Sequence, residues 1–202
     1  HNVLETLYDP DFTESNYGFR RGKSQHQAIR HQRDRVLEGK DWAVSVDLKA
    51  FFDEIPHGLI LKLIRRKVAD EQFVTVLARL LKAGVMIEGI FEKTSKGCPQ
   101  GSPLSPILSN IVLNELDHTL EQRNLAYCRW VDDFVIVVST ERAAKRVMAG
   151  TIRDLEEELG LIVNQEKSCI APIHKITFLG FQILRGKIRV CTKAQRRFKD
   201  RV

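Results

Sequence analysis

What this sequence lacks excludes several classes of protein. It has no apolar run of roughly 18 residues or more, so no segment reads as a membrane-spanning helix. Its four cysteines form no Cys-x-x-Cys pair and no Cys/His cluster with zinc-ligand spacing, which argues against a zinc site. Cys128 and Cys169 lie in apolar surroundings and are expected in the core. No secretory signal opens the chain. We therefore expect a cytoplasmic setting, in a bacterium or inside an organelle.

Repeats and low-complexity linkers are also missing, and positive charge is in moderate excess. The 202 residues carry 32 Lys and Arg against 26 Asp and Glu, a formal net charge of +6. A basic surplus favours a polyanionic partner, because each neutralised phosphate releases counterions. Ordinary solubility charge explains a surplus of this size equally well. The length predicts one domain, or a domain with a fragment of a second.

Hydrophobic periodicity predicts a mixture of helices and strands. Residues 1–18 read as loop. Residues 24–39 suit a helix with Ser24 as N-cap. Its inner face is expected to hold Ala28, Ile29, Val36 and Leu37. Further helices are expected over 57–66, 70–83, 107–123 and 141–159.

Short β-branched and aromatic runs predict the strands. Residues 42–48 read as a buried strand, and 126–130 with 134–138 as a hairpin whose tip is acidic. Two more hairpins are expected, around Gly89 and at 176–190, and two short strands at 161–164 and 168–170. Helices and hairpins mix without strict βαβ alternation. We therefore predict an α+β fold with an antiparallel sheet packed on helices.

Three acids adjoin these apolar strands. Asp47 ends the strand at 42–48, and Asp132 with Asp133 forms the tip of the hairpin. Carboxylates beside buried strands are costly, and carboxylates close together raise one another's pKa. A divalent cation relieves both problems, and oxygen-only ligands suit Mg²⁺. Alternatively, Asp132 and Asp133 are ordinary turn residues, since Asp is common in tight turns.

Six motifs in a fixed order decide between these alternatives. They read NYGFRRGKSQH at 16–26, VDLKAFFDEIP at 46–56, GCPQGSPLSPILSN at 97–110, YCRWVDDFV at 127–135, GLIVNQEKS at 160–168 and FLGF at 178–181. Together they resemble successive blocks of group II intron reverse transcriptases over roughly residues 16–190. The resemblance implies a right-hand polymerase palm with partial fingers. It also implies RNA-directed DNA polymerase activity, a nucleotidyl transfer from dNTP to a primer 3′-hydroxyl.

The resemblance also implies roles at the metal and nucleotide sites. Asp47, Asp132 and Asp133 would be the palm aspartates, holding two Mg²⁺ ions, with Mn²⁺ as a substitute. The Leu48 carbonyl would assist as a metal ligand. Phe52 would close the sugar pocket against a 2′-hydroxyl, although core packing is the alternative for it and its neighbour Phe51. The remaining nucleotide-binding residues would be Gln100, Gly101 and Lys167.

Contacts to primer and template follow by the same resemblance. Phe178, Leu179 and Gly180 resemble the primer grip, with plain core packing as the alternative. Arg20 and Lys23 belong to a basic cluster aimed at template phosphates, with a solvated helix face as the alternative. Arg129, on a strand of the hairpin, supports the acids or pairs with them. Ser105 is expected to cap the helix that follows the third motif.

The motifs depart from the family pattern at three positions. The family usually has Tyr-Ala-Asp-Asp at the hairpin, whereas this chain has Trp130-Val131-Asp132-Asp133. Val131 is larger than Ala and would crowd the primer terminus or the nucleotide sugar. We expect altered fidelity or processivity. Arg21 replaces a usual Pro, which adds charge and loosens the turn.

The boundaries predict a piece of a longer protein. We expect partial fingers at 1–40, a palm at 41–190 with inserted fingers elements at about 66–100, and the start of the thumb or connection at 191–202. Earlier fingers blocks are expected before His1 and a helical thumb after Val202. This fragment alone is expected to polymerise poorly.

The expected partners are an RNA template, a DNA primer, dNTP and a group II intron RNA, with no membrane. The oligomeric state stays open, a dimer included. Two alternative functions remain: an RNA-binding maturase module, and a reverse transcriptase of phage-defence or CRISPR loci.

Overall fold

A four-stranded antiparallel sheet forms the centre of the molecule. The computed structural model describes residues 1–83, 85–87, 90–92, 95–98 and 102–200. The sheet has the strand order β4-β5-β1-β6. Its strands are β1 (Trp42–Val46), β4 (Ala126–Trp130), β5 (Asp133–Val138) and β6 (Cys169–Pro172). The α+β class predicted from the sequence is confirmed, and within the described residues no helix is long and apolar enough to cross a membrane.

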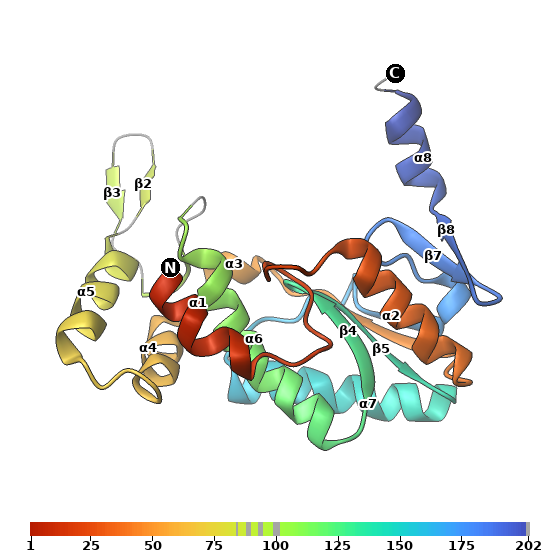
Figure 1. The fold of residues 1–202 in the computed structure, drawn as a ribbon, viewed down its shortest axis with the longest axis horizontal. Helices are drawn as coiled ribbons and strands as arrows, with labels where there is room; N and C mark the ends of the chain where they lie inside the picture. The colour runs from red at the N-terminus through yellow and green to blue at the C-terminus, as the bar shows by residue number, and fades with distance from the viewer. Residues whose placement is uncertain (84, 88–89, 93–94, 99–101, 201–202) are drawn as a thin grey trace.

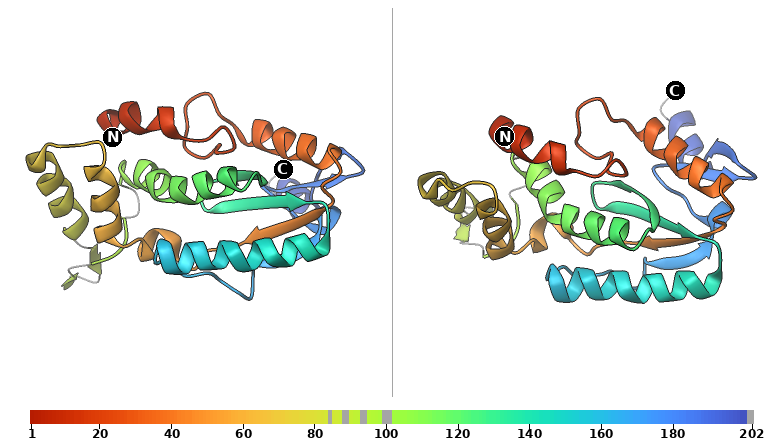
Figure 2. Two further views of the ribbon diagram at one scale, coloured as in Figure 1. Left: turned by 90° about the horizontal axis from the view of Figure 1, so that it is seen from below. Right: turned by 60° about the horizontal axis from the view of Figure 1, so that its bottom comes forward.

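Helices cover both faces of this sheet (Figure 2). On one face, α6 (Ser105–Gln122) and α7 (Glu141–Arg153) pack against strand residues such as Val44 and Phe134 in the main hydrophobic core. On the other face, α2 (Gln25–Leu37) and the C-terminal hairpin enclose a second core with Ala43 and Val135. Neighbouring strand residues thus belong to different cores, as the two-residue period of a strand requires.

The helix α2 begins and ends close to the predicted bounds. The hydroxyl of Ser24 accepts a hydrogen bond from the Gln27 amide at 3.3 Å, so the predicted N-cap is confirmed. Ala28, Ile29 and Val36 are buried as expected, but Leu37 is 65% exposed. Leu37 is the last residue of the helix, where the chain already turns away from the sheet. The buried face uses Gln32 instead.

The N-terminal segment is more regular than the loop predicted for residues 1–18. It forms the helix α1 (Asn2–Tyr8) and the 3-10 turn η1 (Asp9–Asp11). The polar composition of this segment gave no helical pattern in the sequence. The helix is stabilised because Leu4 and Tyr8 are buried in the main core. The Tyr8 hydroxyl donates to the carbonyls of Leu63 or Ile64 at 3.1 and 3.0 Å. Tertiary packing thus overrides weak local propensity.

A further helical segment lies beside α6, on the left of Figure 1, and its buried residues belong to the main core. It contains α4 (His57–Arg65), α5 (Glu71–Lys82) and the short hairpin β2 (Val85–Ile87) with β3 (Ile90–Glu92). The predicted helices 57–66 and 70–83 are confirmed to within a residue. Between β1 and α4 lies the one-turn helix α3 (Phe51–Glu54).

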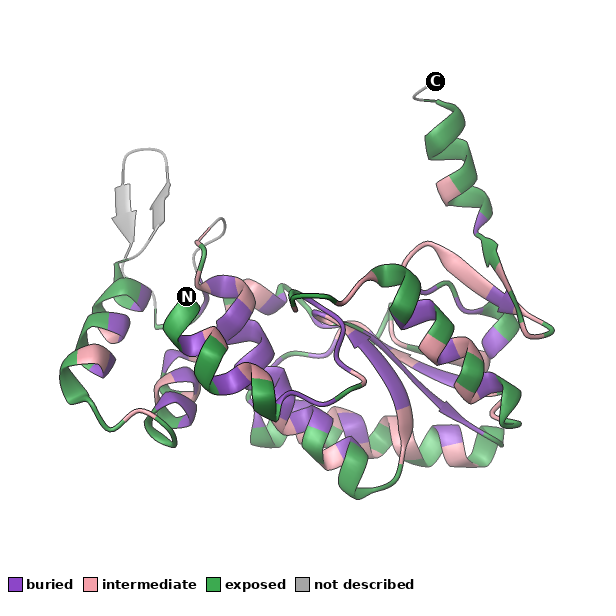
Figure 3. Ribbon diagram, in the orientation of Figure 1, coloured by how far each residue is buried: buried purple, intermediate pink, exposed green. Residues whose placement is uncertain are grey.

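The C-terminal region forms a second hairpin and an exposed helix. Strands β7 (Phe181–Leu184) and β8 (Lys187–Val190) pair antiparallel, and α8 (Thr192–Lys199) follows. No residue of α8 is buried, and the helix extends away from the rest of the molecule (Figures 1 and 3). Its last turn carries Arg196, Arg197 and Lys199.

Three local predictions were wrong. Cys169 is exposed rather than buried, because it begins β6 at the outer edge of the sheet. Ser105 lies inside α6, which has Leu104 at its N-cap position. Residues 161–164 form no extended strand: only Val163 makes an isolated bridge, to Leu48. The predicted helix 141–159 ends its regular part at Arg153 and continues as the π-helical turn η2 (Asp154–Glu158).

Candidate active site at the end of the sheet

The three acids meet at one end of the central sheet. In the β1–β5 register Val46 pairs with Phe134, so the next two opposing positions are Asp47 and Asp133. Adjacent strands lie about 4.8 Å apart, which brings these two backbones together. Asp132 is in the two-residue turn that joins Trp130 of β4 to Asp133 of β5. Asp47 and Asp132, which are 85 positions apart in sequence, thus lie at the same end of the sheet.

The three acids lie close enough to affect one another's ionisation. Burial raises the pKa of Asp132, and the Asp47 carboxylate raises it further, while the Arg129 guanidinium lowers it. Burial, then Asp132 and Asp47, raise the pKa of Asp133 to about 6, against a smaller opposing effect from a hydrogen bond with the Leu179 backbone. Asp133 nevertheless remains exposed in surface area, so solvent screens part of this effect. Mutual repulsion therefore disfavours full ionisation of the cluster.

The carboxylate oxygens of the three acids are the kind of ligand that a hard divalent cation such as Mg²⁺ prefers. The groups that converge are carboxylates, and their repulsion is what a cation would relieve. Within the described ranges, however, no three His, Cys, Asp or Glu side chains are gathered closely enough to hold a metal ion as they stand. The backbone brings the carboxylates to one end of the sheet, and a complete ligand set would need side-chain rotation.

Two residues that sequence reasoning did not single out hold Asp47 in place. The Asn164 amide donates to the Asp47 carbonyl at 2.8 Å. The Asp47 amide donates to the Ser168 hydroxyl at 3.1 Å, and that hydroxyl donates to the Asn164 carbonyl at 2.8 Å. The turn 164–168 is thereby fixed beside Asp47. It carries Lys167, whose amide donates to the Asn164 carbonyl at 3.2 Å and whose side chain is exposed.

The acidic turn itself has an unusual backbone. Val131 has a φ of 60°, in the left-handed region that a β-branched residue rarely adopts. Its side chain is buried. Gly18 lies directly against it: a Cβ added at Gly18 would come 2.3 Å from the Val131 nitrogen. Only glycine therefore fits at this point, for reasons of space.

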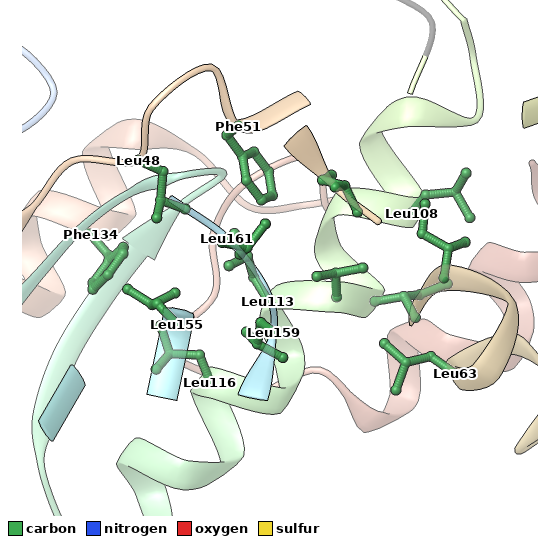
Figure 4. Packing of buried hydrophobic residues seen from close by; sticks show 14 of the residues in the cluster. Leu48, Phe51, Leu63, Leu108, Leu113, Leu116, Phe134, Leu155, Leu159 and Leu161 are labelled. Carbon is green, nitrogen blue, oxygen red and sulfur yellow. The ribbon is translucent and has the colours of Figure 1, made fainter. Parts of the chain in front are cut away.

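Phe51 and Phe52 differ in how far they are buried. Phe51 is 3% exposed and points into the main core beside Leu48 (Figure 4). Phe52 is half-buried, and its ring meets that of Phe51 edge to face with centroids 5.2 Å apart. The Cys98 amide donates to the Phe52 carbonyl at 2.7 Å, which ties α3 to residues 95–98. Gln100 and Gly101, which follow this segment, lie outside the described residues.

A tight turn formed by Phe178, Leu179, Gly180 and Phe181 also reaches the acids. Phe178 and Phe181 exchange two backbone hydrogen bonds of 2.9 Å, and Leu179 and Gly180 have φ values of 52° and 81°. Positive φ at both central residues is the signature of a type I′ turn. Leu179 interacts through its backbone with the Asp133 carboxylate, so the turn lies against the acidic cluster. Phe178 is buried in the second core.

Arg20 and Lys23 are engaged within the chain. Arg20, whose side chain is 8% exposed, forms an ion pair with Asp9 at 2.8 Å and donates to the Thr13 carbonyl at 2.7 Å. Lys23 pairs with Glu14 at 2.6 Å and lies 4.9 Å from the centroid of the Tyr17 ring. A template phosphate would have to replace these acidic partners.

The fold is an antiparallel sheet that is flanked by helices and carries acidic residues at one end. Its likeness to solved structures identifies it as the right-hand polymerase fold. Telomerase from Candida tropicalis, truncated from its C-terminal domain, superposes with a TM-score of 0.72 at 18% identity, covering 94% of this chain and 44% of that one. Telomerase from Candida albicans, solved with a fragment of telomeric RNA, gives 0.64 at 16% identity, over 98% of this chain and 39% of the other.

The chain belongs to the reverse transcriptase family. The family model described as reverse transcriptase (RNA-dependent DNA polymerase) matches residues 1–183. Protein YkfC of Escherichia coli is 32% identical over 93% of this chain and 59% of its own length. The group II intron-encoded protein LtrA of Lactococcus lactis is 37% identical over 63% of this chain and 21% of its own. The chain thus spans 59% of the first of these relatives.

Proposed function

We propose that this chain is the catalytic palm of an RNA-directed DNA polymerase of the group II intron type. The observation that carries the proposal is the convergence of Asp47, Asp132 and Asp133 at one strand end, where burial and the neighbouring carboxylates raise the pKa of Asp132 and of Asp133. Family membership and the homologous intron-encoded proteins support the same activity. The reaction is template-directed nucleotidyl transfer.

In this reaction the primer 3′-oxygen bonds to the α-phosphorus of a dNTP. The bond from that phosphorus to the oxygen that bridges it to the β-phosphorus breaks, and pyrophosphate leaves. The 3′-hydroxyl gives its proton to solvent water. Asp47 and Asp132 would hold two Mg²⁺ ions, with Asp133 and the Leu48 carbonyl assisting. When bound, such ions would supply positive charge that stabilises the attacking and the leaving oxygens. The carboxylates contribute positioning and charge.

Residues around the acids are proposed to shape the nucleotide pocket. Phe52 is the gate against a 2′-hydroxyl, supported by its partial exposure beside the buried Phe51. Lys167 would protonate pyrophosphate, which is supported by the hydrogen bonds that hold its turn beside Asp47. Gln100 and Gly101 complete the pocket by their motif.

Two segments beside the acidic turn are proposed to contact the primer and the template. The turn Phe178–Gly180 would support the primer end, because it lies against Asp133. Val131, buried beside Gly18, would adjust the same region through the turn backbone. Arg20 and Lys23 would reach template phosphates by exchanging their present carboxylate partners.

The domain organisation remains part of the proposal. Residues 1–40 would belong to the fingers, 41–190 to the palm with fingers elements at about 66–100, and 191–202 to the start of the thumb. An intron RNA is a further proposed partner, because several relatives carry names of intron-encoded proteins. In the complete protein, assistance to intron splicing and retrohoming would accompany polymerase activity.

Primer extension on poly(rA)/oligo(dT) tests the proposal with the complete gene product. Extension should require Mg²⁺ and stop with EDTA. Asp132→Ala should abolish extension while leaving intron binding or splicing intact, which separates polymerase from maturase. As a matched control, Asp34→Ala changes an exposed acid on α2 and should leave extension unchanged. The proposal would be refuted if the complete gene product extends no primer, or if its Asp132→Ala variant extends the primer as well as the parent does.

A further inference from the structure

A buried ion pair lies directly behind the acidic turn. Arg129 and Asp117 are both 0% exposed. The Arg129 Nε lies 2.9 and 3.0 Å from the two carboxylate oxygens of Asp117, and its Nη2 donates to Oδ2 at 2.5 Å. Burying two charges is costly, so such a pair is weak evidence for a contribution to stability alone. The remaining contacts of Arg129 show what the pair positions.

The free end of the guanidinium holds the turn that carries the acids. Arg129 Nη1 donates to the Val131 carbonyl at 2.8 Å. Val131 is the residue with the strained φ of 60°, and Asp132 and Asp133 follow it directly. A strained turn persists only where its surroundings fix it. The Arg129 hydrogen bond to the carbonyl at the start of the turn is such a constraint.

The same guanidinium is linked to the N-terminal segment through two asparagines. Arg129 Nη1 also donates to the Asn110 Oδ1 at 3.1 Å, which accepts a second bond from Asn16 at 3.3 Å. The Asn110 Nδ2 donates to the Gly18 carbonyl at 2.8 Å, and the Gly18 amide donates to the Asn16 Oδ1 at 3.1 Å. Both asparagines are almost completely buried.

Backbone contacts close this network. The Arg129 amide donates to the Ser15 carbonyl and the Tyr17 amide to the Arg129 carbonyl, both at 2.9 Å. Asn110 and Asp117 are seven residues apart, two turns along the same face of α6. One helix face therefore fixes the hairpin arginine, the acidic turn and residues 15–18 together.

We propose that Asp117 and Arg129 are positioning residues, which set the acidic turn against the N-terminal segment so that Asp132 can bind metal. The inference rests on the proposed function and deepens it. Neither residue touches the reacting atoms. The pair acts through the Val131 carbonyl, and its loss displaces the carboxylates rather than removing them.

The test is the double variant Asp117→Leu with Arg129→Met in the complete gene product. Apolar replacement of a buried ion pair is often neutral for stability, so this variant should fold with the parent melting temperature. Its kcat should fall about 100-fold, the size of effect that a misplacement of about 1 Å produces, while the KM for dNTP stays unchanged. Mn²⁺ affinity, followed by electron paramagnetic resonance, should fall about 10–100-fold.

Two further variants sharpen this test. Arg129→Lys keeps the charge but lacks a second nitrogen to reach Val131, so it should show the same loss of Mn²⁺ affinity even if the double variant does not fold. The matched control replaces the more exposed pair Arg123–Asp154 in the same way and should behave as the parent.

Three outcomes would overturn the inference. The first is a folded double variant, or a folded Arg129→Lys, with parental kcat and Mn²⁺ affinity. The second is a loss of activity fully matched by a loss of folded protein, which would leave the pair only a structural role. The third is a loss confined to KM. A parent that extends no primer would refute the proposed function separately, and the Mn²⁺ measurement would still decide the inference.

Discussion

Replacing Gly18 by alanine should damage the fold at the acidic turn. A Cβ at this position would come 2.3 Å from the Val131 nitrogen, 2.9 Å from its Cγ2 and 3.1 Å from the Trp130 carbonyl carbon. Two of these three atoms are backbone, so no side-chain rotation relieves the clash. Either Gly18 moves, which strains its bonds to Asn16 and Asn110, or the turn moves.

The expected cost of Gly18→Ala is about 1–3 kcal/mol, the usual range for overpacking a buried site. For a chain of this length each kcal/mol lowers the melting temperature by roughly 2–4 °C, so the variant should melt roughly 2–12 °C below the parent. Primer extension should fall as well, because the displaced backbone carries Asp132. Thermal unfolding and extension are measured on the same preparation.

Two control variants separate this clash from a general effect of alanine. Gly58→Ala places a methyl in open space on helix α4 and should be neutral or stabilising by about 0.4–1 kcal/mol. Adding Val131→Ala to Gly18→Ala removes the Cγ2 contact but not the backbone contact, so it should not rescue stability. A Gly18→Ala variant that melts with the parent would refute the reasoning, as would full rescue by Val131→Ala.

Three other predictions concern the acids and the core. Asp133→Asn should stabilise the metal-free protein at pH 7 by about 1 kcal/mol, discounted for the exposure of this side chain. Because the folded protein raises the pKa of Asp133, the parent loses stability as the pH rises from about 3.8 through about 6. The melting temperatures of the parent and of Asp133→Asn should therefore diverge over that pH range and coincide below it. Equal pH profiles would contradict the shift. Val131→Ala should change the misincorporation rate, and unchanged fidelity would argue against crowding of the primer. Leu108→Ala, at a fully buried site, should lower the free energy of unfolding by about 2–5 kcal/mol. Leu37→Ala, at a residue that is 65% exposed, should change it by no more than about 0.5 kcal/mol. Urea unfolding measures both, and equal costs would contradict the difference in burial.

The meeting of the acids could be predicted from sequence because it depends on backbone register. Once 42–48 and 134–138 are recognised as antiparallel strands, the carboxyl end of one adjoins the start of the other.

A supporting role for Arg129 was predicted, but its buried partners Asp117 and Asn110 were not, because no local pattern marks them. Asn110 and Asp117 lie within a helix whose apolar residues alone suggested a core face, and their partner Arg129 is far away in sequence. A signal was present: both polar residues fall among the buried positions of that helix, two turns apart. A buried polar residue requires a partner, and Arg129 on a buried strand was the available one.

The N-terminal helix shows the opposite limit of sequence reasoning. Asn2–Tyr8 has neither a strong amphipathic pattern nor a side-chain cap bond, and it is helical because Leu4 and Tyr8 reach the main core. Short helices are marginal without such packing. The helix α8 was not predicted as a separate element; its basic sequence has few apolar residues to bury, which agrees with its exposure.

The most direct test of the account is the position of the divalent ions themselves. Crystals of the complete gene product grown with primer, template, incoming dNTP and Mn²⁺ would reveal the ions by anomalous scattering. Two peaks roughly 3.5–4 Å apart should appear, each bound by carboxylate oxygens of Asp47 and Asp132. Ions bound elsewhere, or an Asp47 carboxylate outside their ligand sphere while the polymerase is active, would contradict the central claim.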